Sequence, residues 1–449
     1  MNNHKYLGTA TFYKRALSIA LPIMAQLLIQ NLVSLVDNFM VAGLGDIKMS
    51  GVNIAGQINF VFLVLMNTIC ASGGIFMSQF KGAKDKEGME QTFKFKLIVC
   101  GLIGISYTIL SFIAPRPLFN LMVTTNNDAN IILDYSVIYS KSVALSWLFM
   151  VFSQAIASSL REIEIVKPPL VISIIATLIN TFFNWVFIYG NLGAPRFEVA
   201  GAGYATVIVY AAIKKPEFLF KIKTFLQVKF RLFISIFKKS AMILYSELTW
   251  ALAETISNAL YNTRGGAEVV SGMAAGFVIA NLFFICFSGI VTASGVILGQ
   301  ELGAGKIEEA RKLKNWILNG ALIFGTIFMF IGFATTILIP VTFKNLTQEA
   351  QIIARDLVIV AALYLPLWAY INGQYSISRT GGDTAMGVIC DTVANILFIV
   401  GMIVLIAFTN LGPVLIYGLV KLSDVAKTLI AYFWLKKEKW LVNLTIQPK

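Results

Sequence analysis

Four carboxylates lie inside long apolar stretches of this sequence: Asp37, Glu247, Glu254 and Asp391. A carboxylate that stays charged near the centre of a bilayer costs roughly 3 kcal/mol on an insertion scale, so these side chains should face a protein interior and serve a function. Glu247 and Glu254 are separated by two helical turns, which places them on one helix face about 10 Å apart. Such a face can line a cavity.

The alternative for each carboxylate is neutralisation by a cation from the same apolar stretches, or a position at a hydrated helix end. The available cations are Lys141, Lys421 and Lys427. Lys421, Asp424 and Lys427 recur every three residues and form a charged ridge, which a water-filled cavity tolerates better than lipid. The outer part of that stretch is either a spanning helix or a re-entrant or interfacial segment.

Asp37 has candidate partners with hard oxygen ligands. Asn180 and Asn184 are one helical turn apart and share a face, and Thr206 follows a glycine-rich entry, GAGYAT. Amide and hydroxyl oxygens with one carboxylate suit Na⁺, whereas a buried carboxylate alone can take up a proton near neutral pH. The four residues predict a cation site for Na⁺ or H⁺, and no other metal site. The alternative is that Asn180, Asn184 and Thr206 are interhelical hydrogen-bond partners.

Trp250 lies between the two glutamates and either stacks on an aromatic or cationic substrate or packs in the core. Glu247, Glu254, Trp250 and Asp391 are therefore the candidates for a substrate site or a second cation site. The sequence shows no nucleophile paired with a base. The single histidine, His4, is in the polar N-terminal tail, and the four cysteines show no ligand spacing. We therefore predict neither an enzyme nor a bound cofactor.

The elements that must position these residues are membrane helices. The chain has 449 residues, of which 57% are hydrophobic and 13% charged, with a mean hydropathy of +0.76. This composition excludes a water-soluble enzyme. Apolar stretches of about 20 residues recur along the chain, the length that crosses a bilayer. They predict an all-α integral membrane protein with twelve helices, centred near Ile29, Leu65, Ile105, Leu145, Ile179, Val207, Glu254, Leu282, Phe328, Leu365, Val400 and Ala426.

The basic residues set the predicted orientation. Most of the 36 Lys and Arg residues fall in the two tails and in alternate loops, which places both termini in the cytoplasm of a multi-pass protein of the inner cell membrane. The net charge of +13 is thus a topology signal and does not indicate nucleic acid. The first apolar stretch is too long for the core of a cleavable signal peptide, so we expect it to remain as the first helix.

An internal repeat divides the chain. Gly74 and Gln79 recur as Gly295 and Gln300, an offset of 221 residues, and the same offset relates Ser50 and Gly51 to Ser271 and Gly272. Arg161 and Arg379 are a related pair of matching positions in the two halves. The pattern predicts two pseudo-symmetric six-helix lobes, 1–213 and 240–449, joined by a basic cytoplasmic loop over 214–239. Two lobes of the same orientation create the cavity that alternating access requires, although duplication could also serve only to build a large stable bundle.

Several motifs in order resemble the multidrug and toxic compound extrusion (MATE) family, in its bacterial form. They are LPIMAQLLIQNLVSLVDNFMVAGLG, GGIFMSQFKGAKD, NTFFNWVFIYG with VAGAGYAT, SELTW, GVILGQELGAGKIEEARK and SRTGGDT, and the match extends from about Phe12 to Thr445. The resemblance implies a secondary antiporter that exports organic, often cationic, compounds in exchange for Na⁺ or H⁺. It places the N-lobe cation site at Asp37, Asn180, Asn184 and Thr206, and it assigns Glu247 to a C-lobe site.

This sequence departs from the family at three places. Asn184 stands where some members have a second aspartate, and Trp368 or a neighbour replaces an aspartate of the tenth helix. The sixth helix meets Lys214 and Lys215 early, so it is short or lacks some turns. The alternative function is a lipid-linked oligosaccharide flippase of the same superfamily, which would need a cationic cavity rather than this acidic one. A transporter of either kind contacts membrane lipids and small molecules and needs no partner subunit, so we expect a monomer.

Overall fold

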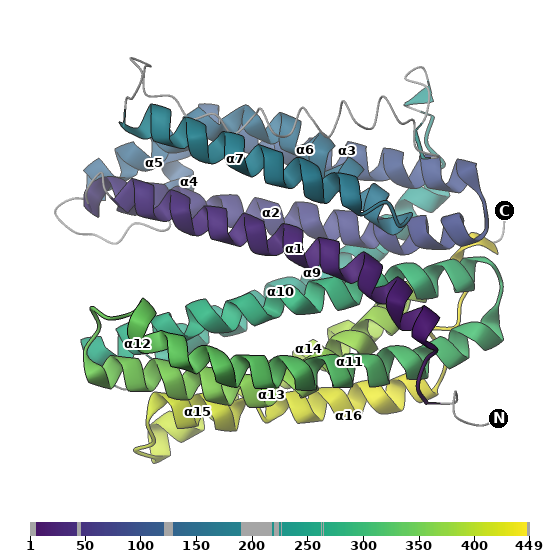
Figure 1. Ribbon diagram of the computed structural model, residues 1–449. Coiled ribbons are helices and arrows are strands. Elements are labelled where there is room, and N and C mark those ends of the chain that lie inside the picture. The colour runs from purple at the N-terminus through teal and green to yellow at the C-terminus, as the bar shows by residue number, and fades with distance from the viewer. Residues whose placement is uncertain are drawn as a thin grey trace. The chain divides into compact units, whose positions relative to one another are not determined.

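The computed structural model describes residues 6–42, 46–120, 129–189, 218–219, 224–225, 227–261, 263 and 265–446. Side chains are not described at 33–42, 46, 48, 49, 180, 183–189, 258, 259, 267 and 286. Throughout these residues the secondary structure is helical (Figure 1). The first half contains α1 (Ala10–Ala42), α2 (Asp46–Gly82), α3 (Lys86–Ile113), α4 (Pro115–Asn120), α5 (Ala129–Ala144), α6 (Ser146–Glu162) and α7 (Lys167–Tyr189). The second half contains α9 (Phe230–Tyr261), α10 (Ala267–Gly303), α11 (Ile307–Thr335), α12 (Ile339–Thr342), α13 (Gln348–Thr380), α14 (Ala385–Phe408), α15 (Pro413–Val420) and α16 (Ser423–Lys436).

The helices confirm an all-helical membrane protein. Within the described residues, seven helices are long and apolar enough to cross a bilayer, and α5 with α6 forms an eighth if a pair bent by 54° counts as one span. Predicted centres lie in helices, except that Leu145 lies at the break between α5 and α6 and Val207 lies outside the described residues. The twelfth predicted span is broken into α15 and α16 at Lys421 and Leu422.

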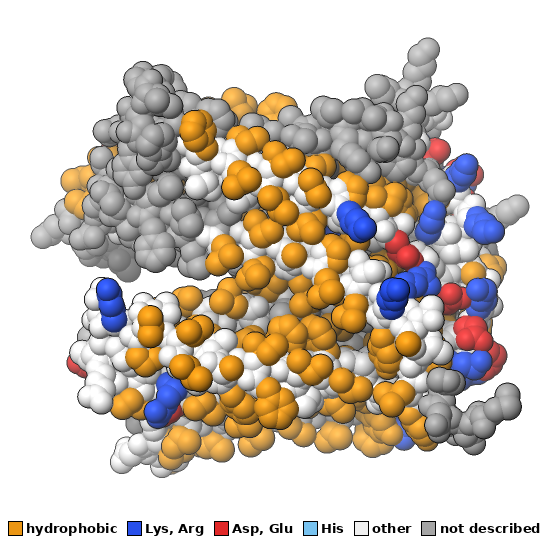
Figure 2. Space-filling model, viewed as in Figure 1, with side chains coloured by type: hydrophobic (Ala, Val, Ile, Leu, Met, Phe, Trp, Pro, Cys, Tyr) orange, Lys and Arg blue, Asp and Glu red, His pale blue; other side chains and the backbone are white. Residues whose placement is uncertain are grey.

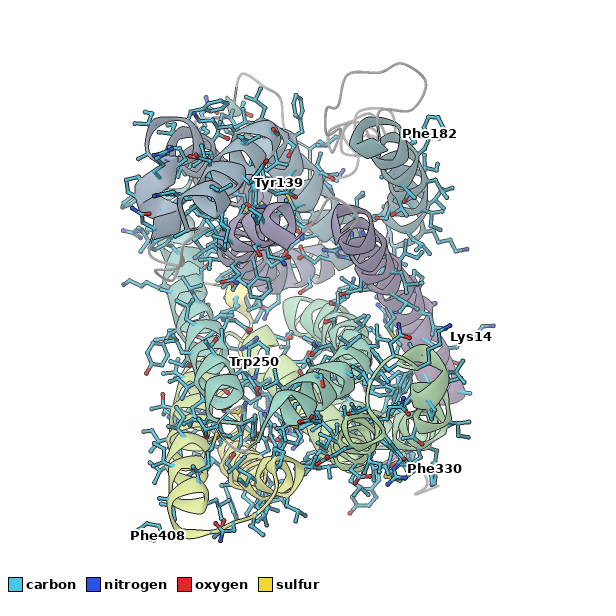
Figure 3. All side chains as sticks on the ribbon, turned by 90° about the vertical axis from the view of Figure 1, so that its left-hand side faces the viewer. Lys14, Tyr139, Phe182, Trp250, Phe330 and Phe408 are labelled. Atoms are coloured by element: carbon cyan, nitrogen blue, oxygen red, sulfur yellow. The ribbon has the colours of Figure 1, made fainter. Side chains whose placement is uncertain are left out.

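The outer face of the helices is apolar. Ile323, Ile327 and Phe330 of α11 are each about half exposed or more, and hydrophobic side chains cover the visible face of this helix (Figure 2). Phe330 projects away from the ribbon (Figure 3). Exposed apolar side chains of this kind are expected where the solvent is lipid.

The contacts divide the chain into two compact units. The C-terminal unit is Met1–Met24 with Ala241–Lys449, and the N-terminal unit is Ala25–Ser240. Helix bounds repeat between the two halves of the sequence: α2 and α10 are both 37 residues long, and each bound of α10 lies 221 positions after that of α2. Likewise, α3 begins at Lys86 and α11 at Ile307. The structure thus confirms the duplication that the motifs predicted.

The first helix of each repeat contributes to both units. In the C-terminal unit, Phe12 of α1 packs edge to face on Trp316 of α11, with ring centroids 5.4 Å apart. In the N-terminal unit, Phe233 of α9 packs in the same way on Phe95 of α3, with centroids 4.9 Å apart. Phe233 lies 221 positions after Phe12, and Phe95 lies 221 positions before Trp316. The duplicated halves therefore reuse one aromatic contact.

Close helix packing in each unit depends on the glycine of the repeated Ser-Gly pair. A Cβ on Gly51 would lie 2.6 Å from Cβ of Tyr135 and 3.0 Å from the carbonyl oxygen of Ile132. A Cβ on Gly272 would lie 2.7 Å from the carbonyl oxygen of Ala350 and 2.8 Å from Cβ of Ile353. Small residues allow membrane helices to approach this closely. The repeat therefore preserves a backbone contact, between α2 and α5 in one unit and between α10 and α13 in the other.

We predict that Gly272→Ala destabilises the protein by about 1–3 kcal/mol, because the added methyl group must displace the backbone of α13. Gly401→Ala is the matched control in the same unit, since its Cβ would meet only Val420, at 3.9 Å. The measurement is the thermal unfolding midpoint of each purified variant in detergent. Equal midpoints for the two variants would contradict the packing account.

Candidate functional site

The predicted N-lobe cation site lies on α1 and α7. Asp37 is in α1 and Asn180 and Asn184 are in α7, but their side chains are not among those described. Thr206 lies outside the described residues. A hydrogen bond joins these two helices at another level, where Nε2 of Gln26 donates to Oγ of Ser173 at 2.8 Å. The cation site itself stays a prediction.

The other candidate carboxylates, Glu247, Glu254 and Asp391, lie in the C-terminal unit, and each has a cation beside it. Glu247 of α9 accepts a hydrogen bond from Arg379 at the end of α13, with Nη1 3.2 Å from Oε1. Arg379 also lies over the ring of Tyr375, 5.4 Å from its centroid. The charge of Glu247 is therefore offset without any bound ion, and by a residue from another helix.

Glu254, two turns further along α9, pairs with Lys421. The Nζ atom of Lys421 donates to Oε1 of Glu254 at 2.6 Å, and the lysine is only 9% exposed. Lys421 lies over the rings of Phe398 at 4.5 Å and Tyr417 at 5.5 Å. A carboxylate and aromatic faces are the surroundings that proteins use to bind organic ammonium groups. The helix break between α15 and α16 presents Lys421 to this environment.

Asp391 of α14 is the most buried of the three, with 4% of its surface exposed. Its Oδ1 lies 2.6 Å from Nζ of Lys427 and accepts a hydrogen bond of 2.8 Å from the hydroxyl of Tyr375. Lys427 in turn lies over the Tyr375 ring, at 4.9 Å. Asp391 therefore belongs to a satisfied triad of residues on α13, α14 and α16, and not to an open ligand site.

Asp424 of α16 completes the charged ridge, which begins at Lys421 in the break between α15 and α16. Its Oδ2 accepts a hydrogen bond of 2.7 Å from Nε1 of Trp368 on α13. Trp368 stands where the family resemblance placed an aspartate in some members, and here it binds an aspartate from a different helix. The ridge of Lys421, Asp424 and Lys427 therefore faces the protein interior, where each member has a partner.

A cavity of about 360 Å³ lies beside Glu254 in the C-terminal unit. Its wall comes from α9, α10 and α15 and includes Trp250, Tyr261, Phe277 and Tyr417. Trp250 is 46% exposed, so it is not a core residue. Its place on α9 is visible in Figure 3. This volume, and a wall of aromatic and aliphatic side chains with one carboxylate, are within the range of sites for small organic molecules.

The sequence leaves open whether the carboxylates are paired and does not identify several of the partners. Lys421 and Lys427 are evident candidates because they lie in apolar stretches, whereas Arg379 is not in the middle of such a stretch and matches Arg161 of the first half. Tyr375 and Tyr261 carry no sequence signal, because a tyrosine in an apolar helix is usually a packing residue. The available signal for Arg379 is its position in SRTGGDT, at the end of α13 that meets the Glu247 side of α9.

Comparisons with known proteins agree with the duplicated fold. Residues 22–186 and 243–406 each match the MatE family profile. The chain is 22% identical over 385 residues to "Probable multidrug resistance protein NorM" of Halalkalibacterium halodurans, and the alignment covers 81% of this chain and 82% of that protein. It is 24% identical over 386 residues to "Multidrug resistance protein NorM" of Vibrio cholerae, with 80% and 79% covered.

Solved structures show the same fold. "Crystal structure of MATE in the bent conformation" superposes with a TM-score of 0.79 at 17% identity, covering 95% of each chain. "Outward-facing conformation of a multidrug resistance MATE family transporter of the MOP superfamily" superposes with a TM-score of 0.79 at 18% identity, covering 95% of each chain. At these identities the likeness concerns the fold alone.

We predict that Lys427→Met destabilises the protein by about 3 kcal/mol, because it leaves the buried Asp391 with Tyr375 as its remaining polar partner. The double variant Asp391→Asn with Lys427→Met should recover most of that loss. Lys436→Met on the same helix is the control, since Lys436 is exposed. Thermal unfolding of the purified variants measures the effect. A double variant no more stable than Lys427→Met would show that the two charges are not coupled.

Proposed function

Because the chain belongs to the MatE family of membrane transporters, we propose that it is a secondary antiporter that exports organic, often cationic, compounds in exchange for Na⁺ or H⁺. The observation that carries the proposal is the cavity of the C-terminal unit, bounded by α9, α10 and α15 and lined by aromatic rings and one carboxylate. A cavity for the pyrophosphate of a lipid-linked oligosaccharide would need cations, whereas the lining residues described here include Glu254 and no Lys or Arg. The geometry thus favours organic cations.

For the coupling ion, we propose the site at Asp37, Asn180, Asn184 and Thr206. The hydrogen bond between Gln26 and Ser173 supports the proximity of α1 and α7. Both helices run in the same direction in Figure 1. Asp37 follows Gln26 by 11 residues, and Asn184 follows Ser173 by 11 residues. Equal spacing along two neighbouring helices supports placing positions 37 and 184 at the same depth.

The charge balance of the C-terminal unit supports the same assignment. Glu247, Glu254 and Asp391 each have a cation of the protein within hydrogen-bonding distance. A coupling ion at any of them would have to displace a lysine or an arginine. We therefore assign the coupling ion to Asp37, which the sequence pairs with the amide and hydroxyl residues of the proposed site.

Transport then follows from competition for negative charge. A cation that enters from outside neutralises Asp37, which weakens the hold of the protein on a cationic substrate. On the cytoplasmic side the cation leaves, the carboxylate recovers its charge, and a substrate loads. We further propose that the transporter works as a monomer in the inner membrane with both termini in the cytoplasm. Its lobes are 1–213 and 240–449, and the basic segment 214–239 joins them.

We predict that Asp37→Asn abolishes coupled efflux while leaving insertion and folding intact. The measurement is efflux of a fluorescent organic cation from liposomes under an imposed Na⁺ gradient and then under a pH gradient, and the gradient that drives efflux identifies the ion. Asp356→Asn is the control, because Asp356 is a partly exposed carboxylate paired with its neighbour Arg355. Full coupled efflux by Asp37→Asn would overturn the proposed ion site.

A further inference from the structure

The cavity beside Glu254 contains an unusual feature, because the carboxylate that lines it already holds an ammonium group of the protein. Glu254 is among the residues lining the cavity, whereas Lys421 is not. The Nζ atom of Lys421, a residue at the break between α15 and α16, lies 2.6 Å from Oε1 of Glu254. A ligand in the cavity would therefore meet the carboxylate first and the lysine only through it.

The surroundings of Lys421 are those of an ammonium-binding site. Its Nζ atom contacts the carboxylate of Glu254 and also lies 4.5 Å from the centre of the Phe398 ring and 5.5 Å from that of the Tyr417 ring. Tyr417 also lines the cavity, next to Phe277, whose ring packs edge to face on it at 5.6 Å. The aromatic wall is thus shared between the lysine and the cavity beside it.

A second, independent observation points to a ligand. Tyr261 lines the same cavity and is only 1% exposed, yet its hydroxyl has no hydrogen-bond partner among the described residues. Buried hydroxyl groups in native proteins are usually hydrogen-bonded, so an unsatisfied one on a residue of the cavity wall is a group that a ligand can satisfy once the wall adjusts to it. The Tyr261 and Tyr417 rings lie 6.0 Å apart, on neighbouring parts of the wall.

We propose that this cavity binds an aromatic organic cation and that Lys421 is its built-in competitor for Glu254. Before a ligand enters, Lys421 neutralises the carboxylate, which would otherwise be an unpaired charge within the membrane. An incoming cation stacks on the aromatic wall and competes with Lys421 for the negative charge of Glu254, and a cation that carries a polar group can also satisfy the Tyr261 hydroxyl. Lys421 keeps its contacts with Phe398 and Tyr417. The inference rests on the proposed function, for which it names a substrate class and a site.

The competition has a direct consequence for affinity. Removing the lysine charge leaves Glu254 free for the ligand, so cation binding should become tighter rather than weaker. Removing the carboxylate leaves Lys421 unpaired, so the site should lose its preference for cations and gain one for anions. A merely structural ion pair would predict weaker binding of every ligand in both variants.

The test uses two probes of the same shape and opposite charge, tetraphenylphosphonium and tetraphenylborate. Their binding to the purified full-length protein is measured by equilibrium dialysis in detergent, without any ion gradient. We expect the wild type to prefer the phosphonium. Lys421→Met should bind it at least tenfold tighter, and Glu254→Gln should bind it at least tenfold more weakly and the borate more tightly. Lys436→Met, which removes an exposed lysine, should match the wild type.

Two further variants keep the test decisive. If either single variant fails to fold, the double variant Glu254→Gln with Lys421→Met carries no unpaired charge, and it should bind the two probes within about twofold of each other. Tyr261→Phe should weaken the binding of a ligand that has a hydrogen-bonding group, such as ethidium with its amino groups. It should leave the binding of tetraphenylphosphonium unchanged. Unchanged or weaker phosphonium binding by a folded Lys421→Met, or a retained phosphonium preference in the double variant, would overturn the proposal.

The binding experiment and the transport experiment can refute the site proposal and the antiporter proposal independently. If the affinity pattern holds but no gradient drives efflux from liposomes, the site stands and the antiporter proposal is wrong. If coupled efflux is observed but none of the variants changes the ratio of the two affinities, the antiporter stands and the cavity is not its cation site.

Discussion

A charge inside a lipid bilayer must be neutralised by something that the protein supplies or binds, and this constraint organises the C-terminal unit. Glu247, Glu254 and Asp391 are paired with Arg379, Lys421 and Lys427, and the partners come from α13, from the break after α15, and from α16. The N-terminal unit follows the same rule, since buried Lys96 lies 2.5 Å from Glu162. Where the protein provides its own counter-charge, no free ion is required.

The duplication makes the two halves comparable position by position. α7 begins at Lys167 and α14 at Ala385, an offset of 218 residues. This offset relates Asn180 to Phe398 and Asn184 to Met402. One half thus has amide groups where the other has a phenylalanine and a methionine, and the phenylalanine faces the ammonium group of Lys421. Under the proposed function the two halves differ in the cation that they hold: the proposed site of the first half offers oxygen ligands to a free cation, whereas in the second half Lys421 supplies the cation.

The helices and the internal repeat could be predicted from the sequence, but the ion pairs of the carboxylates could not. Apolar stretches of bilayer length identify the helices, and the recurrence of Gly74 and Gln79 as Gly295 and Gln300 reveals the repeat, because both signals are local. Glu254 and Lys421 are 167 residues apart, and sequence alone could not decide among the cations available to each carboxylate. Tyr261 could not be predicted because an unsatisfied hydroxyl is a property of packing. The helix breaks at Leu145 and at Lys421 have no Pro or Gly at the site, so no local signal of the sequence predicts them.

The central claim is that Glu247, Glu254 and Asp391 are occupied by the protein's own cations, so the coupling ion binds at the proposed site of the N-terminal unit. The most direct test is the number of coupling ions bound at saturation by one purified polypeptide, measured with radiolabelled Na⁺ or, for proton coupling, by the protons released when a substrate binds. The account predicts one ion per chain. Two ions per chain, with the second lost on substitution of Glu247, Glu254 or Asp391, would contradict it.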